Sequence, residues 1–349
     1  MIGVDIFAGV GGMSLGAAYS KIDVKVAIEN DPYAAATYKF NHPKTKVIVE
    51  DIRSIRIEDL PKSKKSKVLF GGSPCQGFST SNQKTRNKSN PSSWLLMEFI
   101  RIAKIWHPEW IVFENVKGIV ETSNGLFLYK LKQNLSNLGY TLSEWILNAA
   151  DYGVPQKRNR YFLIGSINGI IIDKPISTNE KRVTVRDAIY DLPILDNGST
   201  INTKPYRKVK PSNYAKGRRN GKKHIANNLV TKNSNLILDR YKYVPQGGNW
   251  RDIPLQLMSN YSDSSRCHSK IYHRLKWDEE SVVIGNYRKN MLIHPEQDRG
   301  LSVREAARLQ SFPDAFEFKG SVGFQQQQVG NAVPPFLAKK VFNGIQNSM

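Results

Sequence analysis

Ile2-Gly3-Val4-Asp5-Ile6-Phe7-Ala8-Gly9-Val10-Gly11-Gly12 is a β-prone apolar run that passes directly into a glycine-rich turn. Residues 13–19 follow with the composition of a helix. A strand, a glycine turn and a helix in this order are typical of α/β proteins. Glycines in such a turn let the backbone approach a ligand closely. Nicotinamide and flavin enzymes use similar turns, and a simple tight connection also fits, so the turn alone does not identify the ligand.

Strands and helices alternate through the first half of the sequence. We expect strands over residues 2–7, 24–28, 46–49, 67–70, 110–113, 141–148 and 161–167. We expect helices over 13–19, 94–106 and 127–138, and another that starts at Pro32 with Asp31 as its N-cap. This alternation predicts an α/β fold with a doubly wound, mostly parallel sheet, helices on both faces and functional residues at the carboxyl ends of the strands.

The character of the sequence changes at about residue 168, where polar, basic and turn residues become dominant. Residues 203–223 hold nine Lys or Arg and no acidic residue. Helical periodicity returns over 302–311 and again from about 336. We therefore predict a first domain over 1–167, a second, smaller irregular domain over 168–325, and a C-terminal segment over 326–349 that returns to the first domain.

The bulk composition indicates a folded protein with a polyanionic partner. The 349 residues are 40% hydrophobic and carry a formal net charge of +21. Such an excess favours nucleic acid as a partner, although a merely basic protein is the alternative. The two cysteines do not make a disulfide framework and fit a reducing cytoplasm. No apolar run approaches the roughly 18 residues of a membrane span, so we expect no membrane association, and we expect no metal.

Two acidic residues follow the second and third predicted strands. Glu29 ends the second strand, and an acid there can bind both ribose hydroxyls of an adenosine-type cofactor. Asp51 and Ile52 follow the third strand, where an acid and an apolar side chain can take the adenine amine and ring face. Together these residues fit a nucleoside cofactor without specifying which one.

Cys75 lies in a turn, Gly72-Ser73-Pro74-Cys75-Gln76, directly after the fourth predicted strand. A thiolate is a strong nucleophile once its pKa falls below the free value of about 8.5. A buried structural cysteine is the alternative, against which its polar and turn neighbours argue. Glu114 ends the fifth strand, and burial can raise a carboxyl pKa until the acid donates a proton to a ring nitrogen. A helix-capping or salt-bridge role is the alternative for Glu114.

Six motifs together give the sequence a family resemblance. They are Phe7-Ala8-Gly9-Val10-Gly11-Gly12, Gly72-Ser73-Pro74-Cys75-Gln76, Glu114-Asn115-Val116, Gln156-Lys157-Arg158-Asn159-Arg160, Arg304-Glu305-Ala306-Ala307-Arg308-Leu309-Gln310 and Gly330-Asn331-Ala332-Val333-Pro334. In this order they resemble the DNA (cytosine-5)-methyltransferases, from residue 2 to about 340. Ser73 departs from the family pattern, because a second proline is frequent at that position.

The resemblance implies a bacterial or phage enzyme of restriction-modification type that methylates C5 of a flipped cytosine in double-stranded DNA. Cys75 would add to C6 of the base, Glu114 would hydrogen-bond N3 and the exocyclic amine, and Arg160 would contact O2. Arg158 and Gln156 would support Arg160. The polar segment 79–93 resembles the loop that closes over the base, with an ordinary solvated loop as the alternative.

The resemblance also implies S-adenosyl-L-methionine as the cofactor of a catalytic domain over 1–167. The matching pocket residues are Phe7, Gly9, Gly11, Gly12, Glu29, Asp51, Ile52, Pro74, Leu95, Asn331 and Ala332. The segment 168–325 would be the target-recognition domain with its hinge helix, in which the basic stretch would hold phosphates. Residues 247–252 are candidates for groove contacts, although a solvated loop is equally compatible.

Three other functions also fit the sequence. The closest is a tRNA cytosine-5 methyltransferase of the same family, and the second is a catalytically inactive DNA-binding relative. A nicotinamide dehydrogenase fits the glycine turn but leaves the Cys75 turn and the basic stretch unexplained. We expect no obligate protein partner and a structural role for Cys267, and the recognised DNA sequence is not predicted.

Overall fold

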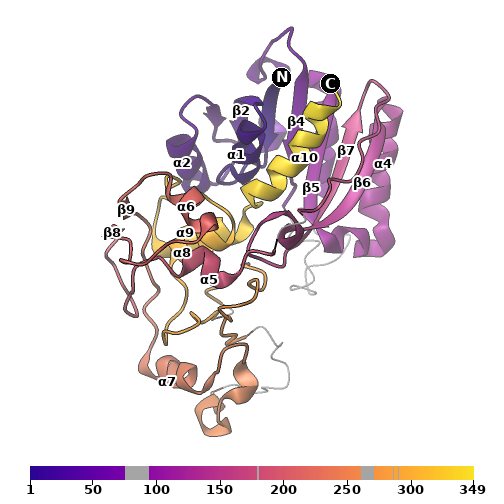
Figure 1. The fold of residues 1–349 in the computed structure, drawn as a ribbon. Coiled ribbons are helices and arrows are strands. Elements are labelled where there is room, and N and C mark those ends of the chain that lie inside the picture. The colour runs from indigo at the N-terminus through magenta and orange to yellow at the C-terminus, as the bar shows by residue number, and fades with distance from the viewer. Residues whose placement is uncertain (75–93, 179–180, 261–270, 286, 290) are drawn as a thin grey trace. The chain divides into compact units, whose positions relative to one another are not determined.

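The computed structural model describes residues 1–74, 94–178, 181–260, 271–285, 287–289 and 291–349 (Figure 1). The described chain divides into two compact units. Unit 1 comprises Met1–Tyr152, Arg158–Thr178 and Val333–Met349, and unit 2 comprises Gly153–Lys157 and Asn179–Ala332. The predicted domain boundaries at 167/168 and 325/326 stay a prediction.

Unit 1 is built on a seven-stranded sheet with the order β3-β2-β1-β4-β5-β7-β6 (Figure 1). Its strands are β1 (Ile2–Ile6), β2 (Asp23–Ile28), β3 (Lys46–Ile48), β4 (Lys67–Gly71), β5 (Trp110–Val116), β6 (Thr141–Asn148) and β7 (Asn159–Ser166). The pairs β1–β2, β1–β4, β2–β3 and β4–β5 are parallel, whereas β7 runs antiparallel to both β5 and β6. The predicted mostly parallel α/β sheet is therefore confirmed.

Helices cover both faces of this sheet, as predicted. They are α1 (Gly12–Tyr19), α2 (Pro32–Asn41), α3 (Leu96–Trp106), α4 (Leu126–Asn137) and α10 (Pro335–Asn347). The Phe70 ring of β4 contacts Phe342 of α10, with centroids 5.0 Å apart, and Phe113 of β5 contacts Phe99 of α3 at 5.4 Å. Gly71 is the register partner of Phe113. Because neighbouring residues of a strand point to opposite faces, α10 and α3 lie on opposite faces.

Local sequence explains several helix boundaries in unit 1. The Asp31 Oδ1 accepts hydrogen bonds from the Tyr33 and Ala34 amides at 2.8 and 3.3 Å, and Pro32 stands at the first helical position of α2. This is the predicted cap. A Cβ at Gly16 would lie 2.5 Å from the Ala338 side chain, so glycine lets α1 and α10 pack closely. Three-residue and four-residue 3₁₀ turns fill connections at 52–54, 57–59, 117–120, 122–125 and 149–152.

Unit 2 has short elements joined by long irregular segments. They are α5 (Val185–Ile189), α6 (Asn213–Arg219), α7 (Asn235–Tyr243), α8 (Val303–Leu309), α9 (Val322–Asn331), the antiparallel pair β8 (Lys204–Pro205) and β9 (His224–Ile225), and 3₁₀ turns at Trp250–Asp252 and Leu255–Met258. Ser302 and Glu305 form a capping box at the start of α8. In the part of the chain that the structure describes, no helix is both long and apolar enough to cross a bilayer.

Buried arginines hold unit 2 together. Arg308 donates to Asp314 through Nε at 2.5 Å and Nη2 at 2.6 Å, and also pairs with Asp191 at 3.2 Å. Arg304 donates to the Ala226 and Phe316 carbonyls at 2.9 and 2.6 Å. Each buried guanidinium is thus matched by acceptors, which is the condition under which a buried charge is tolerated.

A buried polar chain lies beneath the glycine turn of unit 1. The Ser14 hydroxyl donates to Asp5 Oδ2 at 2.6 Å, and the Tyr38 hydroxyl donates to Ser14 Oγ at 2.6 Å. Asp5 is 1% exposed, in the middle of the apolar strand β1. Burial raises the pKa of Asp5 to about 8, against the lowering effect of the Ser14 hydrogen bond. Asp5 therefore carries a proton over most of the neutral range.

We expect Asp5→Asn to remove a pH dependence of stability. In the folded state the pKa of Asp5 is about 8, against 3.8 as the ordinary value, so folding binds this proton more tightly. Its contribution to the free energy of unfolding is full below about pH 4 and is lost as the pH rises through about 8. The melting temperature of Asp5→Asn relative to wild type should thus rise from pH 5 to pH 8. Asp23→Asn, at an exposed position of β2, is the control, and a difference that does not change with pH would contradict the assignment.

Candidate functional site

The glycine turn joins β1 to α1 through three residues in left-handed backbone, and at Gly11 only glycine fits. Phe7, Gly9 and Gly11 have φ angles of 56°, 55° and 88°. A Cβ on Gly11 would lie 2.5 Å from His42 Nε2, whereas a Cβ on Gly9 would meet no atom within 4 Å. Left-handed backbone at a bulky residue such as Phe7 is uncommon and concentrates at functional sites. The turn therefore presents an open stretch of backbone at Gly9 to a ligand.

Glu29 ties the end of β2 to this turn. The Gly9 amide donates to Glu29 Oε2 at 2.7 Å, and the Asp31 amide donates to Oε1 at 2.8 Å. Burial raises the pKa of Glu29, and these backbone hydrogen bonds oppose the shift. Each carboxylate oxygen can accept more than one hydrogen bond. The residue can thus fix the turn and still accept from ribose hydroxyls, the role predicted for it.

The residues after β3 are placed differently from one another. Ile52 is buried in the apolar core of unit 1. The Asp51 carboxylate is held by the Arg53 guanidinium at 2.9 and 2.6 Å, and these hydrogen bonds lower the pKa of Asp51 to about 2. Asp51 is thus ionised at neutral pH, and Arg53 holds its carboxylate in place. Its predicted contact with an adenine amine stays a prediction.

Glu114 and Arg160 form an ion pair at the carboxyl edge of the sheet. Arg160 Nε lies 2.9 Å from Glu114 Oε1, and both side chains are largely buried. Val116 of β5 is the register partner of Arg160 in β7, which places Glu114 and Arg160 on the same face. Burial raises the pKa of Glu114, while Arg160 and Arg158 act in the opposite direction. The pair can therefore present a carboxyl group and a guanidinium to one planar polar ligand.

Two neighbouring residues at the end of β5 hold the turn that follows β4. A Cβ on Gly72 would lie 2.5 Å from Glu114 Oε2, so only glycine fits beside that carboxylate. Asn115 Nδ2 donates to the Ser73 carbonyl at 3.1 Å and to its hydroxyl at 3.3 Å, and both residues are buried. Pro74 follows at a half-buried position. Cys75, the predicted nucleophile, and the predicted loop 79–93 lie outside the described residues.

The structure separates the residues of the Gln-x-Arg-x-Arg motif. Gln156 is fully buried in unit 2, where its amide donates to the Leu309 carbonyl and accepts from the Ile284 amide at 3.2 and 2.9 Å. Arg158 is 1% exposed in unit 1, and its backbone is bound by Asn148 and Ala149. Within the motif, Arg160 is the residue that the structure pairs with Glu114.

The remaining predicted cofactor residues fall in both units. Leu95 is partly buried against the apolar core of unit 1, and Gly12 begins α1. Asn331 ends α9 and Ala332 is its C-cap, both in unit 2. Among the described residues, no group of three or more His, Cys, Asp or Glu is placed to hold a metal ion.

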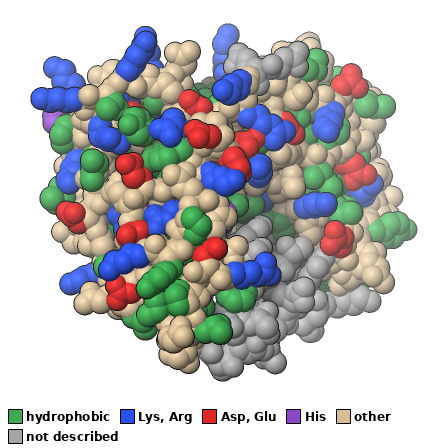
Figure 2. All heavy atoms as spheres, turned by 60° about the horizontal axis from the view of Figure 1, so that its bottom comes forward, with side chains coloured by type: hydrophobic (Ala, Val, Ile, Leu, Met, Phe, Trp, Pro, Cys, Tyr) green, Lys and Arg blue, Asp and Glu red, His purple; other side chains and the backbone are tan. Residues whose placement is uncertain are grey.

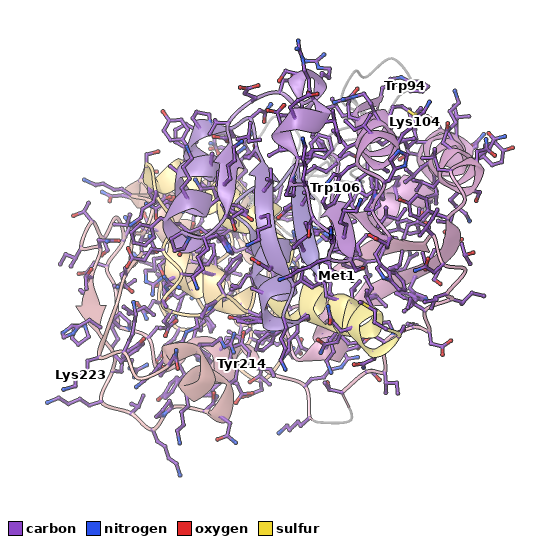
Figure 3. All side chains as sticks on the ribbon, turned by 90° about the horizontal axis from the view of Figure 1, so that it is seen from above. Met1, Trp94, Lys104, Trp106, Tyr214 and Lys223 are labelled. Carbon is purple, nitrogen blue, oxygen red and sulfur yellow. The ribbon has the colours of Figure 1, made fainter. Side chains whose placement is uncertain are left out.

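The basic stretch 203–223 divides by residue type. Its arginines pack inside unit 2: Arg219 pairs with Asp191 at 2.7 Å, Arg218 donates to the Ser311 carbonyl, and Arg207 donates to the Tyr190 carbonyl. Exposed lysines remain for phosphate contacts, namely Lys208, Lys210, Lys216, Lys222 and Lys223. Lys223 points away from the ribbon in Figure 3. Fewer of the nine basic residues are thus available to a polyanionic partner than the composition suggests.

The loop 247–252 is stabilised by its own polar side chains. Asn249 and Asp252 form a capping box around the 3₁₀ turn Trp250–Asp252, and a Cβ on Gly248 would lie 2.6 Å from Asp252 Oδ2. Arg251 is exposed and lies over the Trp250 ring at 5.5 Å. A groove contact by this loop, which stays a prediction, would therefore fall to Arg251.

Sequence reasoning missed two sets of residues. The Asp5–Ser14–Tyr38 chain had a visible signal, because an acid inside an apolar strand needs a partner. The Asn115–Ser73 contact had none, because it joins residues 42 positions apart through two neighbouring strands.

Comparison with known proteins gives consistent results over the whole chain. The sequence pattern of the C-5 cytosine-specific DNA methylase family matches residues 1–347. The chain is 34% identical over 347 residues to the Type II methyltransferase M1.HphI of Haemophilus parahaemolyticus, covering 98% of this chain and 86% of that protein. It is 33% identical over 361 residues to the Type II methyltransferase M.DdeI of Desulfomicrobium norvegicum, covering 96% and 86%. The crystal structure of a candidate DNA modification methyltransferase encoded in an Escherichia coli prophage matches with a TM-score of 0.80 and 28% identity, covering 100% of this chain and 99% of that one.

The mostly parallel seven-stranded sheet with helices on both faces is that of an S-adenosylmethionine-dependent methyltransferase. Within that class, the chain belongs to the C-5 cytosine-specific DNA methylase family. The resemblance predicted from the six motifs is confirmed.

We expect Glu29→Ala to weaken binding of S-adenosylmethionine at least about tenfold, because the ribose hydroxyls of the cofactor would lose a charged acceptor, a hydrogen bond of about 1.5–3 kcal/mol. Binding of duplex DNA should change less. Isothermal titration calorimetry gives the first affinity and fluorescence anisotropy the second. Asp173→Ala, at an exposed position of unit 1 that no proposed site includes, is the control. A larger loss of DNA affinity than of cofactor affinity would contradict the assignment of Glu29.

Proposed function

We propose that this protein is a DNA (cytosine-5)-methyltransferase of restriction-modification type. It transfers a methyl group from S-adenosylmethionine to C5 of a cytosine in a specific duplex site, through a covalent bond between Cys75 and C6. The observation that carries the proposal is the Glu114–Arg160 pair, which lies beside the turn that leads to Cys75. The match to the C-5 cytosine-specific DNA methylase family supports DNA as the substrate, and the similarity to Type II methyltransferases supports a restriction-modification role. We infer that the protein protects host DNA and acts in the cytoplasm.

The residues at the glycine turn fit a nucleoside cofactor. Gly9 faces open space, and the Glu29 carboxylate stands next to it with acceptor capacity for hydroxyl groups. Phe7, Gly9, Gly11, Gly12 and Glu29 would hold S-adenosylmethionine, with Ile52 on the adenine side. When bound, the cofactor supplies the methyl group that the base takes up at C5.

Activation of the base is the task of the protein's own side chains. Cytosine C5 is a weak nucleophile, so the Cys75 thiolate adds to C6, forming a C–S bond and pushing electron density toward C5. Glu114 supplies a proton to N3 as negative charge develops there, and Arg160 binds O2. After methylation the C5 proton leaves to water, the C–S bond breaks and restores the thiolate, and N3 returns its proton to Glu114. The base must be flipped out of the duplex, at a cost of a few kcal/mol.

The raised pKa of Glu114 suits this role, because a protonated carboxyl group can donate to N3. The Arg160 guanidinium beside it stabilises the ionised carboxylate, so that Glu114 can release the proton. The neighbouring Asn115–Ser73 hydrogen bonds fix the start of the Cys75 turn relative to Glu114. Two adjacent residues of β5 thus divide the work: Glu114 is the proposed acid, and Asn115 holds the turn at Ser73.

Bisulfite sequencing of DNA from cells that express the protein tests the proposal directly. We expect 5-methylcytosine at one recurring duplex sequence. Labelled methyl groups incorporated into tRNA but not into duplex DNA would instead favour the tRNA-modifying alternative. An intact protein that modifies neither would favour an inactive DNA-binding relative.

We expect Cys75→Ser to abolish methyl transfer while leaving the affinity for S-adenosylmethionine nearly intact, because a hydroxyl is a far weaker nucleophile than a thiolate. Labelled-methyl incorporation and calorimetry give the two quantities. Cys267→Ser, which removes the other cysteine, should remain active. Substantial turnover by Cys75→Ser would show that Cys75 is not the nucleophile.

We expect Glu114→Gln to lower the methylation rate by about 10²–10⁴, the usual contribution of general acid catalysis. The wild-type rate should fall as the pH rises through the raised pKa of Glu114, since the proton donor is lost, and this limb should be absent in the variant. Glu144→Gln is the matched control, because Glu144 also pairs with a cation, Lys132, but lies on β6 away from the site. A variant that keeps the wild-type pH limb would refute the acid role.

A further inference from the structure

A lysine-rich loop, Pro61-Lys62-Ser63-Lys64-Lys65-Ser66, leads into β4 of unit 1 and is fixed at both ends. Trp106 Nε1 donates to the Pro61 carbonyl at 3.0 Å, and the Ile2 amide donates to the Ser66 carbonyl at 2.8 Å. Lys67, the first residue of β4, donates through Nζ to the Trp106 carbonyl at 2.9 Å. The loop therefore has a defined position, and the lysines between its anchored ends are held at the surface.

These lysines form a positively charged surface. Lys62, Lys64 and Lys65 are exposed, as is Lys46 at the start of β3. Lys46, Lys62 and Lys65 line an open pocket of about 440 Å³. In the part of the chain that the structure describes, none of the four lies within ion-pair distance of a carboxylate.

The acidic groups nearby do not neutralise this charge. Lys25, which also lines the pocket, is paired with Asp23 at 2.6 Å. Glu58 and Asp59 line the pocket as well, and Asp59 accepts a hydrogen bond from the Arg56 amide at 2.9 Å. Two carboxylates thus share the pocket with Lys46, Lys62 and Lys65, which have no ion-pair partner among the described residues, and the surface keeps a net positive charge.

The lysine loop lies at the opposite edge of the sheet from the candidate site. The starts of β1, β2 and β4 are in register, with Ile2 opposite Asp23 and Lys67. The glycine turn follows the other end of β1, five residues and about 17 Å away. Figure 3 looks onto the end of unit 1 at which Met1 and Trp106 lie. A duplex is stiff over about 150 bp, so DNA bound at the carboxyl edge does not wrap around to this edge within a few turns.

We propose that the lysine loop is a second DNA-binding surface, which contacts the phosphates of a duplex segment remote from the base being methylated. The inference rests on the proposed function for the identity of the polyanion. Lysine suits the role, because it offers a flexible point charge that neutralises phosphates without reading sequence. One protein molecule would then hold two duplex segments, one at each edge of unit 1.

A two-duplex capture assay tests this surface. A short duplex of about 20 bp that carries the methylated sequence is immobilised, the protein is added, and a labelled duplex without the site is captured from solution. The variant Lys62→Gln/Lys64→Gln/Lys65→Gln is compared with wild type. The matched control is Lys62→Arg/Lys64→Arg/Lys65→Arg, which keeps the charge. Methylation of the short duplex alone and the melting temperature are measured for each protein.

We expect wild type and the arginine control to capture the second duplex, and the glutamine variant to do so at least about tenfold less well. The slope of log affinity against log salt for the second duplex should fall by about 2 to 3, near 0.9 for each phosphate that the variant no longer neutralises. Methylation of the short duplex should be unchanged in all three proteins.

Three results would overturn the inference. The first is capture of the second duplex by the glutamine variant as efficient as by wild type. The second is a loss of short-duplex methylation as large as the loss of capture, which would mean a general electrostatic effect. The third is displacement of the second duplex more readily by RNA or an acidic peptide than by DNA. If wild type methylates nothing, the proposed function fails. The capture assay is then run with any immobilised short duplex that the protein binds, and it still decides whether the lysine loop binds DNA.

Discussion

The antiparallel direction of β7 is the constraint on which the candidate site depends. Arg160 is the second residue of this strand, and it lies beside Glu114 only because β7 runs against β5. In a parallel arrangement the start of an eight-residue strand would lie at the other edge of the sheet, about 25 Å away. Because β7 is reversed, Arg160 near its start lies at the edge of the sheet where the parallel strands end.

The second constraint is the cost of the glycine turn. Phe7 is held in left-handed backbone, a conformation that costs roughly 1–3 kcal/mol and persists only where the surrounding structure enforces it. Two contacts do so: Glu29 accepts from the Gly9 amide, and the Ala8 amide donates to the Ile28 carbonyl at 3.0 Å. Asp5, Ser14 and Tyr38 support the turn from below with hydrogen bonds that avoid a buried charge. The glycine turn is thus fixed by Glu29 and a strand carbonyl, and it is supported by three buried residues that have no proposed role in catalysis or cofactor binding.

The sequence predicts those features that depend on local pattern. Apolar runs and glycines located the strands and the turn, and Asp31-Pro32 located a helix start, because each signal lies within a few residues. The pairing of Arg160 with Glu114 and of Asn115 with Ser73 was not predictable from pattern, since both require strand order and direction. The placement of Gln156 in unit 2 is a further example, because its partners Ile284 and Leu309 are more than 120 positions away.

The sequence also does not show which positive charges are exposed, and the chemistry of Lys and Arg explains why. Composition counts Lys and Arg alike, but a planar guanidinium can satisfy several acceptors at once, whereas an ammonium is a compact, strongly hydrated charge. Unit 2 accordingly buries Arg304 and Arg308 among carbonyls and carboxylates. Figure 2 shows lysine and arginine side chains spread over the face drawn there, with acidic side chains among them. The excess of +21 is therefore partly internal structure and partly surface, and only the exposed part, chiefly lysine, is available to a polyanion.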